Sequence, residues 1–144
     1  MQLSKAERSV GYLVKRVQQG LRRRCDTALK PTGLSMAQYA TLRALAEHPD
    51  ASAAELARLC FVTRQSLQDM LAGLRAAGLV ETAEAPPRGR SRSLALTRLG
   101  SRRLSAAHDA VFSAEAVMLQ GVSAREQRSV ADVLARCAEN VESG

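Results

Sequence analysis

Apolar residues near the start of the chain recur at steps of three and four positions, which is the period of one face of a helix. This stripe consists of Val10, Leu13, Val14, Val17, Leu21, Cys25 and Ala28. Ser4 and Glu7 have the spacing of a capping box, in which a hydroxyl and a carboxylate satisfy backbone N–H groups at a helix start. We therefore predict a helix over residues 4–30, ended by Pro31 and Gly33.

The same period continues in a second helix, which Ser35 can cap and which must stop before Pro49. Its buried side is predicted to consist of Met36, Tyr39, Ala40, Leu42, Leu45 and Ala46. Across the whole chain aromatic residues make up only 3% and alanines are numerous, a composition that favours helices.

Two helices separated by a very short break follow. Ser52 and Glu55 form a second capping box before the first of them, and Thr63 can cap the next. The apolar positions of that next helix are Leu67, Met70, Leu71 and Leu74. Because only residues 60–62 separate the two helices, they must cross at a steep angle, which predicts a helix-turn-helix.

After Gly78 the apolar pattern changes to that of short strands, over residues 79–82 and 93–96. The segment between them, 85–92, contains prolines, a glycine and three arginines, so it predicts the basic tip of a β-hairpin. A helix-turn-helix followed by such a hairpin is a winged helix, in which one helix enters the major groove of DNA and the hairpin contacts the backbone or minor groove.

Two more helices are predicted at the end of the chain. The first begins at Thr97 or Arg98 and runs to about Gln120, and the second begins at Ser123, where Glu126 completes a third capping box. The fold class is therefore mainly α with a small β-hairpin wing, in one domain over 1–144. Within it we assign a winged helix-turn-helix to 34–100 and dimerisation helices to 4–30 and 101–142, because their apolar stripes exceed what the small lobe can cover.

The net charge of the chain indicates the kind of partner that it binds. The 144 residues include 21 Lys and Arg against 14 Asp and Glu, and a surface with a net charge of +7 suits a polyanion such as nucleic acid or an anionic membrane. No stretch approaches the ~20 apolar residues that span a bilayer, so no membrane partner is expected. Arginine outnumbers lysine eighteen to three, which suits contacts to phosphate or guanine, although a GC-rich genome produces the same bias.

The cysteines and histidines do not have the sequence spacing of metal ligands. Cys25, Cys60 and Cys137 are odd in number and contain no C-x-x-C pair, which favours a reducing, cytoplasmic compartment over disulfides or zinc. The first residues lack the apolar core of a secretory signal. His48 and His108 are far apart in sequence, and neither a metal nor a cofactor is expected. Cys25 follows three arginines, which favour a reactive thiolate, but it also continues the apolar stripe, and packing is the favoured interpretation.

The candidate DNA-binding residues lie around the two helices of the predicted motif and in the wing. They are Ser52, Thr63, Arg64, Gln65, Ser66 and Gln68, with Arg88, Arg90 and Arg92 in the wing tip. The side chains of Arg64, Gln65 and Gln68 are of types that hydrogen-bond to base edges. Asp69 shares their side of the helix, but an acid is a poorer candidate for base contact.

The chain resembles the MarR family of bacterial transcriptional regulators. The resemblance rests on four segments in order: 34–42, 52–57, 74–81 and 94–100. It implies an obligate dimer, held by the first helix and the last two, in which each recognition helix and wing binds half of a near-palindromic operator. The wing departs from the family pattern, because Ala85-Pro86-Pro87-Arg88-Gly89-Arg90 stands where an Asp-x-Arg element is usual.

These observations predict a sequence-specific regulator of transcription, a dimeric repressor that responds to a ligand and binds double-stranded DNA. The alternative is a winged-helix module that binds a protein, or an architectural protein that binds DNA without sequence preference. An enzyme is not expected, because no nucleophile with a base, no paired carboxylates and no phosphate-binding glycine loop are present.

Two aromatic and basic pairs are candidates for binding an effector. Tyr12 and Arg16, like Tyr39 and Arg43, lie four residues apart, so each pair can place a ring beside a cation on one helix face. Such a pair suits a small aromatic or anionic molecule, with its carboxylate bound by the guanidinium. The alternative is that the tyrosines pack in the core and the arginines are solvated.

Overall fold

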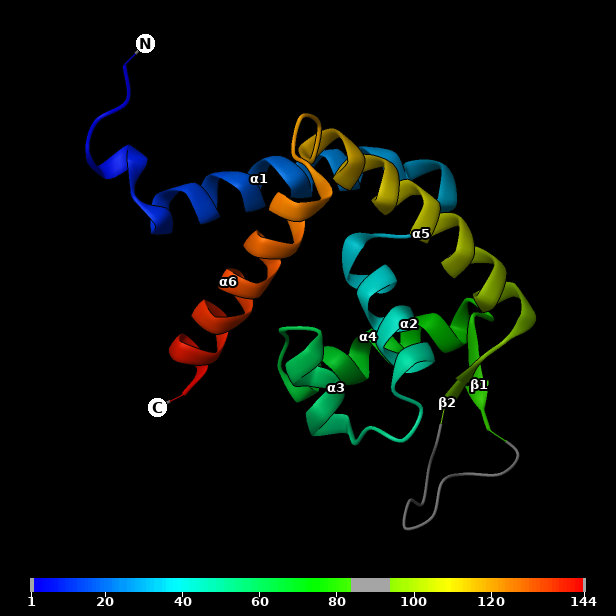
Figure 1. Cartoon of the computed structure of the whole chain (residues 1–144). Coiled ribbons are helices and arrows are strands. Elements are labelled where there is room, and N and C mark those ends of the chain that lie inside the picture. Colours follow the sequence, from blue (N-terminus) through cyan, green and yellow to red (C-terminus); the bar gives the residue numbers. More distant parts are fainter. Residues whose placement is uncertain (1, 84–93, 144) are drawn as a thin grey trace. The chain divides into compact units, whose positions relative to one another are not determined.

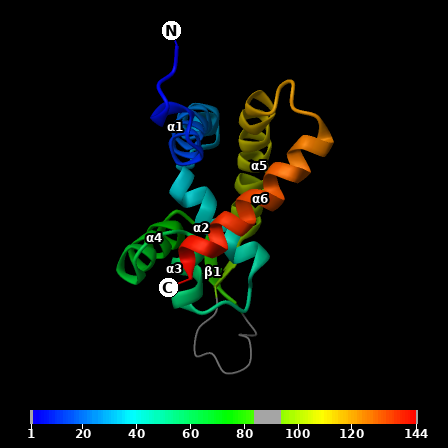
Figure 2. The same cartoon turned by 60° about the vertical axis from the view of Figure 1, so that its left-hand side comes forward.

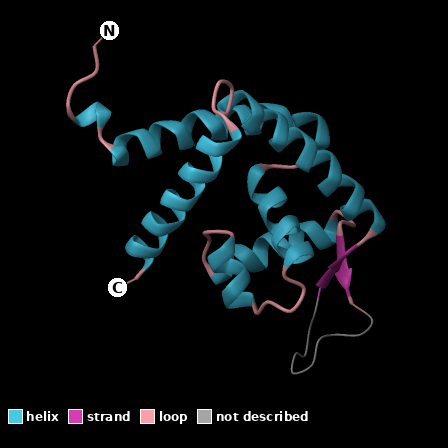
Figure 3. Ribbon diagram, in the orientation of Figure 1, coloured by secondary structure: helices cyan, strands magenta, loops and turns pink. Residues whose placement is uncertain are grey.

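The computed structural model describes residues 2–83 and 94–143, and the chain divides into two compact units, Met1–Ala114 and Glu115–Gly144. Unit one contains most of the elements and is mainly helical with one hairpin, as predicted (Figures 1 and 3). The elements are the 3-10 turn η1 (Ala6–Arg8), α1 (Val10–Leu29), the 3-10 turn η2 (Lys30–Thr32), α2 (Met36–Glu47), α3 (Ala53–Leu59), α4 (Arg64–Ala76), β1 (Val80–Thr82), β2 (Leu94–Leu96), α5 (Arg98–Met118) and α6 (Ala124–Glu142). None of the helices in the described part of the chain is long and apolar enough to cross a membrane.

The first helix begins later than its sequence pattern predicts. Ser4 and Glu7 do exchange hydrogen bonds, with Ser4 N–H donating to Glu7 Oε2 at 2.7 Å and Glu7 N–H donating to Ser4 Oγ at 3.2 Å. The bond from the Ser4 backbone N–H lowers the pKa of the Glu7 carboxyl, but the pair spans only the short turn η1. Ser9 then takes an extended backbone with ψ 152° and accepts a hydrogen bond from Tyr12 N–H, so it caps α1. The predicted start at Ser4 is wrong because a second cap residue interrupts the helical backbone.

Helix α2 lies at the centre of unit one. It contacts α1, α3, α4 and β2, and Figures 1 and 2 both place it between α1 and the pair α3 and α4. Contacts from several sides bury Tyr39, Thr41, Leu42, Ala44 and Leu45. The predicted burial of Ala46 is wrong, because Ala46 is exposed and Thr41 and Ala44 are buried in its place. A single-stripe pattern cannot locate the core face of a helix that is covered on more than one side.

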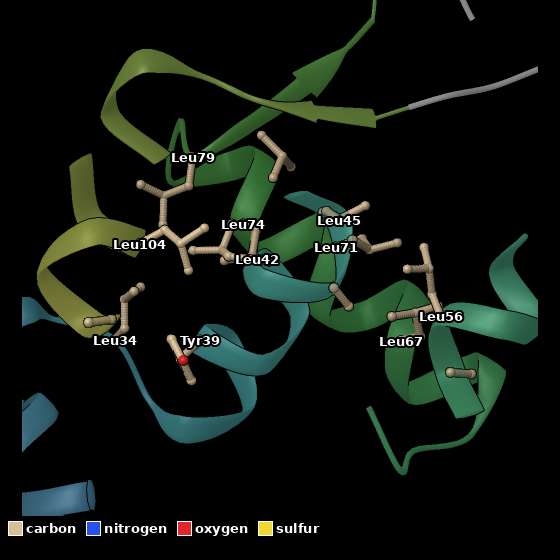
Figure 4. Packing of buried hydrophobic residues seen from close by; sticks show 14 of the residues in the cluster. Leu34, Tyr39, Leu42, Leu45, Leu56, Leu67, Leu71, Leu74, Leu79 and Leu104 are labelled. Carbon is tan, nitrogen blue, oxygen red and sulfur yellow. The ribbon is translucent and has the colours of Figure 1, made fainter. Parts of the chain in front are cut away.

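The core of unit one is built from side chains far apart in sequence. Leu29, Leu42, Leu67, Leu74 and Val80 are the largest aliphatic side chains that are fully buried, and they come from α1, α2, α4 and β1. Figure 4 shows Leu42 and Leu74 side by side under the hairpin, with other labelled leucines around them. Cys25 is also buried, at 2% exposure, as the packing interpretation predicts, whereas Cys60 is half-buried and Cys137 is exposed.

The hairpin is joined tightly to the helices on either side of it. Strands β1 and β2 are antiparallel, with Val80 opposite Leu96 and Thr82 opposite Leu94. The N–H of Thr97, directly after β2, donates to the carbonyl of Leu79 at 3.0 Å. Helix α5 starts there because the Thr97 hydroxyl accepts a hydrogen bond from Gly100 N–H at 3.0 Å. The residue after β2 is therefore tied to the residue before β1 by a backbone bond outside the strand pairing.

The second unit contains the end of α5 and helix α6. The turn between them places Gly121 at φ 76°, and Ser123 and Glu126 form the predicted capping box. The backbone hydrogen bond from Ser123 lowers the pKa of the Glu126 carboxyl. Helix α6 has no buried residue, although its sequence carries a regular apolar stripe that includes Val130, Val133 and Leu134.

The contact between Gly100 and Leu79 gives a stability prediction. A Cβ on Gly100 would collide with the carbonyl oxygen of Leu79, which is backbone and is already bonded to Thr97. Gly100→Ala should therefore lower the free energy of unfolding by about 3 kcal/mol or more. Gly73→Ala, at a helical site with no atom within 4 Å of the new Cβ, should raise it by roughly 0.5–1 kcal/mol. Chemical denaturation of both variants checks this, and equal stability of the two would contradict it.

Candidate nucleic-acid interface

Helices α3 and α4 form the predicted helix-turn-helix. The Ser52 hydroxyl accepts from Glu55 N–H at 3.1 Å, and the Thr63 hydroxyl accepts from Ser66 N–H at 3.0 Å, so each residue caps its helix. Leu56 and Ala57 of α3 are buried in the same cluster as Leu67 of α4. The Cys60 thiol also reaches the carbonyl of Ala40, at 3.8 Å, and so connects the end of α3 to α2.

Helix α4 separates an apolar side from a polar side. Leu67, Leu71 and Leu74 are buried, while the candidates Arg64, Gln65, Ser66 and Gln68 are all exposed. This arrangement places the four polar side chains away from the core, as predicted. Their contact with DNA stays a prediction.

Some polar side chains of α4 form hydrogen bonds within the chain and others do not. Gln65 Nε2 donates to Asp69 Oδ1 at 3.1 Å, and the hydroxyls of Thr63 and Ser66 are 3.0 Å apart and hydrogen-bonded. The Ser52 hydroxyl likewise donates to Glu55 Oε1 at 2.9 Å. Within the part of the chain that the structure describes, Arg64 and Gln68 make no side-chain hydrogen bond. The guanidinium of Arg64 and the carboxamide of Gln68 are therefore available to bind a partner without first breaking a hydrogen bond within the described residues.

The base of the wing is described, but its tip is not. Arg75 Nη2 donates to Thr82 Oγ1 at 2.7 Å and Thr97 Oγ1 donates to the Gly78 carbonyl at 2.6 Å, so β1 and the residue after β2 are tied to α4 or the turn after it. Arg88, Arg90 and Arg92 lie outside the described residues. Their role in DNA binding stays a prediction.

The positive charge of the described residues is concentrated at the start of the chain. Residues 34–83 and 94–100 together hold five Arg and five Asp or Glu, so the described lobe is balanced. Residues 1–33 hold eight Lys and Arg against two acids, including the exposed Arg22, Arg23 and Arg24 of α1. The net positive charge of the described residues therefore lies in residues 1–33, mostly on α1, none of which the candidate DNA-binding set includes.

The two candidate effector pairs are placed differently. Tyr12 and Arg16 are both exposed on α1. Tyr39 is buried, its hydroxyl is hydrogen-bonded to His108 Nδ1 at 3.0 Å, and Arg43 pairs with Glu47 at 3.0 Å. The structure therefore does not present the Tyr39 ring and the Arg43 guanidinium together at the surface.

A pocket that the sequence patterns did not indicate lies beside α4. It has a volume of about 270 Å³ and is lined by residues of α2, α3, α4, β2 and the connecting loops, among them the apolar Leu45, Pro49 and Leu71 and the polar Gln68 and Arg75. Only Gln68 was a candidate, because lining residues from four elements share no spacing that a sequence pattern could display. Among the described residues no group of His, Cys, Asp or Glu is arranged to hold a metal ion.

A helix-turn-helix whose second helix exposes polar side chains, followed by a hairpin, defines a winged-helix DNA-binding protein. Comparison with known proteins agrees. The sequence model of the MarR family matches residues 32–91. The HTH-type transcriptional repressor Rv2887 of Mycobacterium tuberculosis and its counterpart Mb2911 of Mycobacterium bovis are each 37% identical to the chain over 119 residues, covering 83% of it and 86% of the relative. The chain belongs to the MarR family of transcriptional regulators.

Solved structures of Rv2887 resemble the chain as well. Its complex with salicylic acid has a TM-score of 0.72 at 35% identity, covering 90% of this chain and 96% of that one. Its complex with DNA has a TM-score of 0.71 at 34% identity, covering 90% and 97%. The similarity therefore includes regions well outside the helix-turn-helix.

Proposed function

We propose that the protein is a dimeric transcriptional repressor that binds a pseudo-palindromic operator through α4 and releases it on binding a small aromatic acid. The observation that carries the proposal is the exposed polar face of α4, set on a buried apolar face and followed by a tethered hairpin. The relatives named transcriptional repressors, and the DNA complex of Rv2887, support the same conclusion.

Dimerisation is supported by apolar surface that a single chain leaves uncovered. On α1, Val10, Val14 and Val17 are exposed, and the stripe of α6 is exposed throughout. A helix of 19 residues with no buried side chain gains little from propensity alone and needs a packing partner. A two-fold dimer would place two α4 helices about 34 Å apart, one turn of duplex.

The dimer proposal predicts the effect of a charge in the α1 stripe. Val17→Asp should convert the protein to a monomer and abolish operator binding, because it would bury an unpaired carboxylate. Gln19→Asp, an equal charge change at an exposed polar position of α1, should leave both properties unchanged. Sedimentation at micromolar concentration measures the mass. A wild-type protein that sediments as a monomer would contradict the dimer.

Sequence-specific binding is assigned chiefly to Gln68. Its carboxamide is exposed and has no hydrogen bond within the described residues, and a glutamine can bond to the N6 and N7 edge of adenine. Gln65 is held by Asp69 and would have to exchange that bond. Discrimination between bases by Gln68 would separate a specific repressor from an architectural protein that binds DNA without sequence preference.

Replacing Gln68 should therefore change specificity rather than general affinity. Gln68→Ala should lose about 1–3 kcal/mol of discrimination at one base pair of each half-site while binding to random DNA survives. Binding to selected and random duplexes at fixed salt gives the two values, with Gln19→Ala as the control. If Gln68→Ala weakens both duplexes equally, Gln68 does not contact a base.

An aromatic acid is the effector class that the comparisons support, because Rv2887 has been crystallised with salicylic acid and with p-aminosalicylic acid. The pocket beside α4 offers an apolar lining and the guanidinium of Arg75. Its volume of about 270 Å³ is ample, since an apolar cavity of about 150 Å³ holds benzene. Tyr12 with Arg16 offers a second, more open place for such a molecule.

Three arginine variants test the pocket beside α4, the Tyr12 and Arg16 pair, and the candidate Arg43 as binding sites for the effector. Salicylate should release the operator from the wild-type protein, and the arginine that binds the carboxylate should be the one whose replacement abolishes release. Arg75→Ala, Arg16→Ala and Arg43→Ala are titrated with salicylate against the operator complex, each first matched for operator affinity without ligand. Coupling between ligand and DNA of about 1–3 kcal/mol is expected. Release that is equal in all four proteins would show that none of these arginines binds the effector.

A further inference from the structure

The turn between α3 and α4 contains an unusual residue. Phe61 has φ 57° and is the one residue other than glycine with a positive φ among residues 2–83 and 94–143. The other positions with positive φ are Gly33, Gly78 and Gly121, each at 76°. An L side chain in this left-handed region is crowded by its own backbone, which is why glycine is favoured there.

The hydrogen bonds of the turn do not require a phenylalanine. Phe61 N–H donates to the Arg58 carbonyl at 3.2 Å and Val62 N–H donates to the Ala57 carbonyl at 3.0 Å. The end of α4 makes the same pair of bonds around Gly78, from Gly78 N–H to Arg75 and from Leu79 N–H to Leu74. The chain therefore builds this helix ending once with glycine and once with phenylalanine, and glycine suffices for the geometry.

The core does not require this ring either. Phe61 is 88% exposed, the largest exposed fraction among the large apolar side chains of the described residues. Its neighbour Val62 is 37% exposed. A residue that is strained in its backbone and also exposes an aromatic ring stabilises neither the turn nor the core. Such a combination points to a contact outside the chain.

We propose that Phe61 contacts DNA at the edge of the major groove, where its ring packs on the C5-methyl group of a thymine. This inference rests on the proposed function. In a helix-turn-helix the first residues of the second helix meet the base edges while the first helix crosses the backbone, so the turn lies at the mouth of the groove. The thymine methyl is the apolar group that the major groove presents.

The surroundings of Phe61 favour DNA over a protein partner. Arg58 and Arg64, three residues to either side, are exposed and carry the charge that phosphates attract. Glu55 and Asp69, the nearest acids in sequence, are engaged in the cap with Ser52 and in the bond with Gln65. Phe61 would thus add an apolar contact next to the polar contacts of α4 and would make the operator's preference for thymine part of its specificity.

The experiment combines a protein variant with a modified operator. Phe61→Gly removes the ring and the backbone strain, so its melting temperature should rise while its affinity for the operator falls. Replacing operator thymines one at a time by deoxyuridine removes only the methyl group. One thymine in each half-site should cost the wild-type protein roughly fourfold in affinity, the value expected for one buried methyl. Leu59→Ala, in the adjoining turn of α3, is the control and should lose no methyl dependence.

The double-mutant comparison decides the outcome. If the ring packs on the methyl, the Phe61→Gly protein should bind the thymine and deoxyuridine operators equally. If Phe61→Gly keeps the same loss on deoxyuridine as the wild type, or binds the operator as tightly as the wild type, the inference is wrong. Failure of the proposed function would look different, because the wild-type protein would then prefer no operator and Gln68→Ala would change nothing.

Discussion

The burial of α2 is the constraint on which the rest of the first unit depends. This helix contacts α1, α3, α4 and β2, and Leu42 at its centre is fully buried. Elements that are distant in sequence are therefore placed by one shared partner. The hydroxyl of the buried Thr41 donates to the Ala37 carbonyl at 2.8 Å, so even the polar atom on this crowded helix is satisfied without interrupting the packing. This packing and the direct bond from Arg75 of α4 to Thr82 of β1 together position α4 relative to the hairpin.

The polar side chains of the helix-turn-helix include two groups, those that cap a helix and those without a hydrogen bond among the described residues. The hydroxyls of Ser52 and Thr63 are engaged in caps, which fix where each helix begins. The carboxamide of Gln68 and the guanidinium of Arg64, without a hydrogen bond in the described part of the chain, keep their full capacity for a partner. A capped helix that carries polar side chains without internal hydrogen bonds suits base recognition, because the backbone is positioned in advance and the side-chain donors and acceptors remain available.

Local structural rules are obeyed almost everywhere and broken at the turn of the motif. Glycine stands at the left-handed ends of η2 and α4 and at the turn before α6, and Gly100 stands where a carbonyl approaches too closely for a Cβ. Phe61 is the departure. Natural sequences are expected to depart from such rules where function requires it, and a DNA contact of Phe61 would be such a requirement.

Elements whose signals are local could be predicted from the amino-acid sequence. Caps such as Ser35, Ser52 and Ser123, the glycine after α4 and the change of period at the hairpin depend on neighbours within a few residues, and the structure confirms them. Features that depend on contacts between distant segments could not be predicted in this way: the burial of Thr41 instead of Ala46, the bond from Tyr39 to His108 and the pocket beside α4. Even the start of α1 was ambiguous, since Ser4 and Ser9 are both competent caps. Local hydrogen bonds can be inferred from spacing, but burial depends on which surfaces the folded chain brings together.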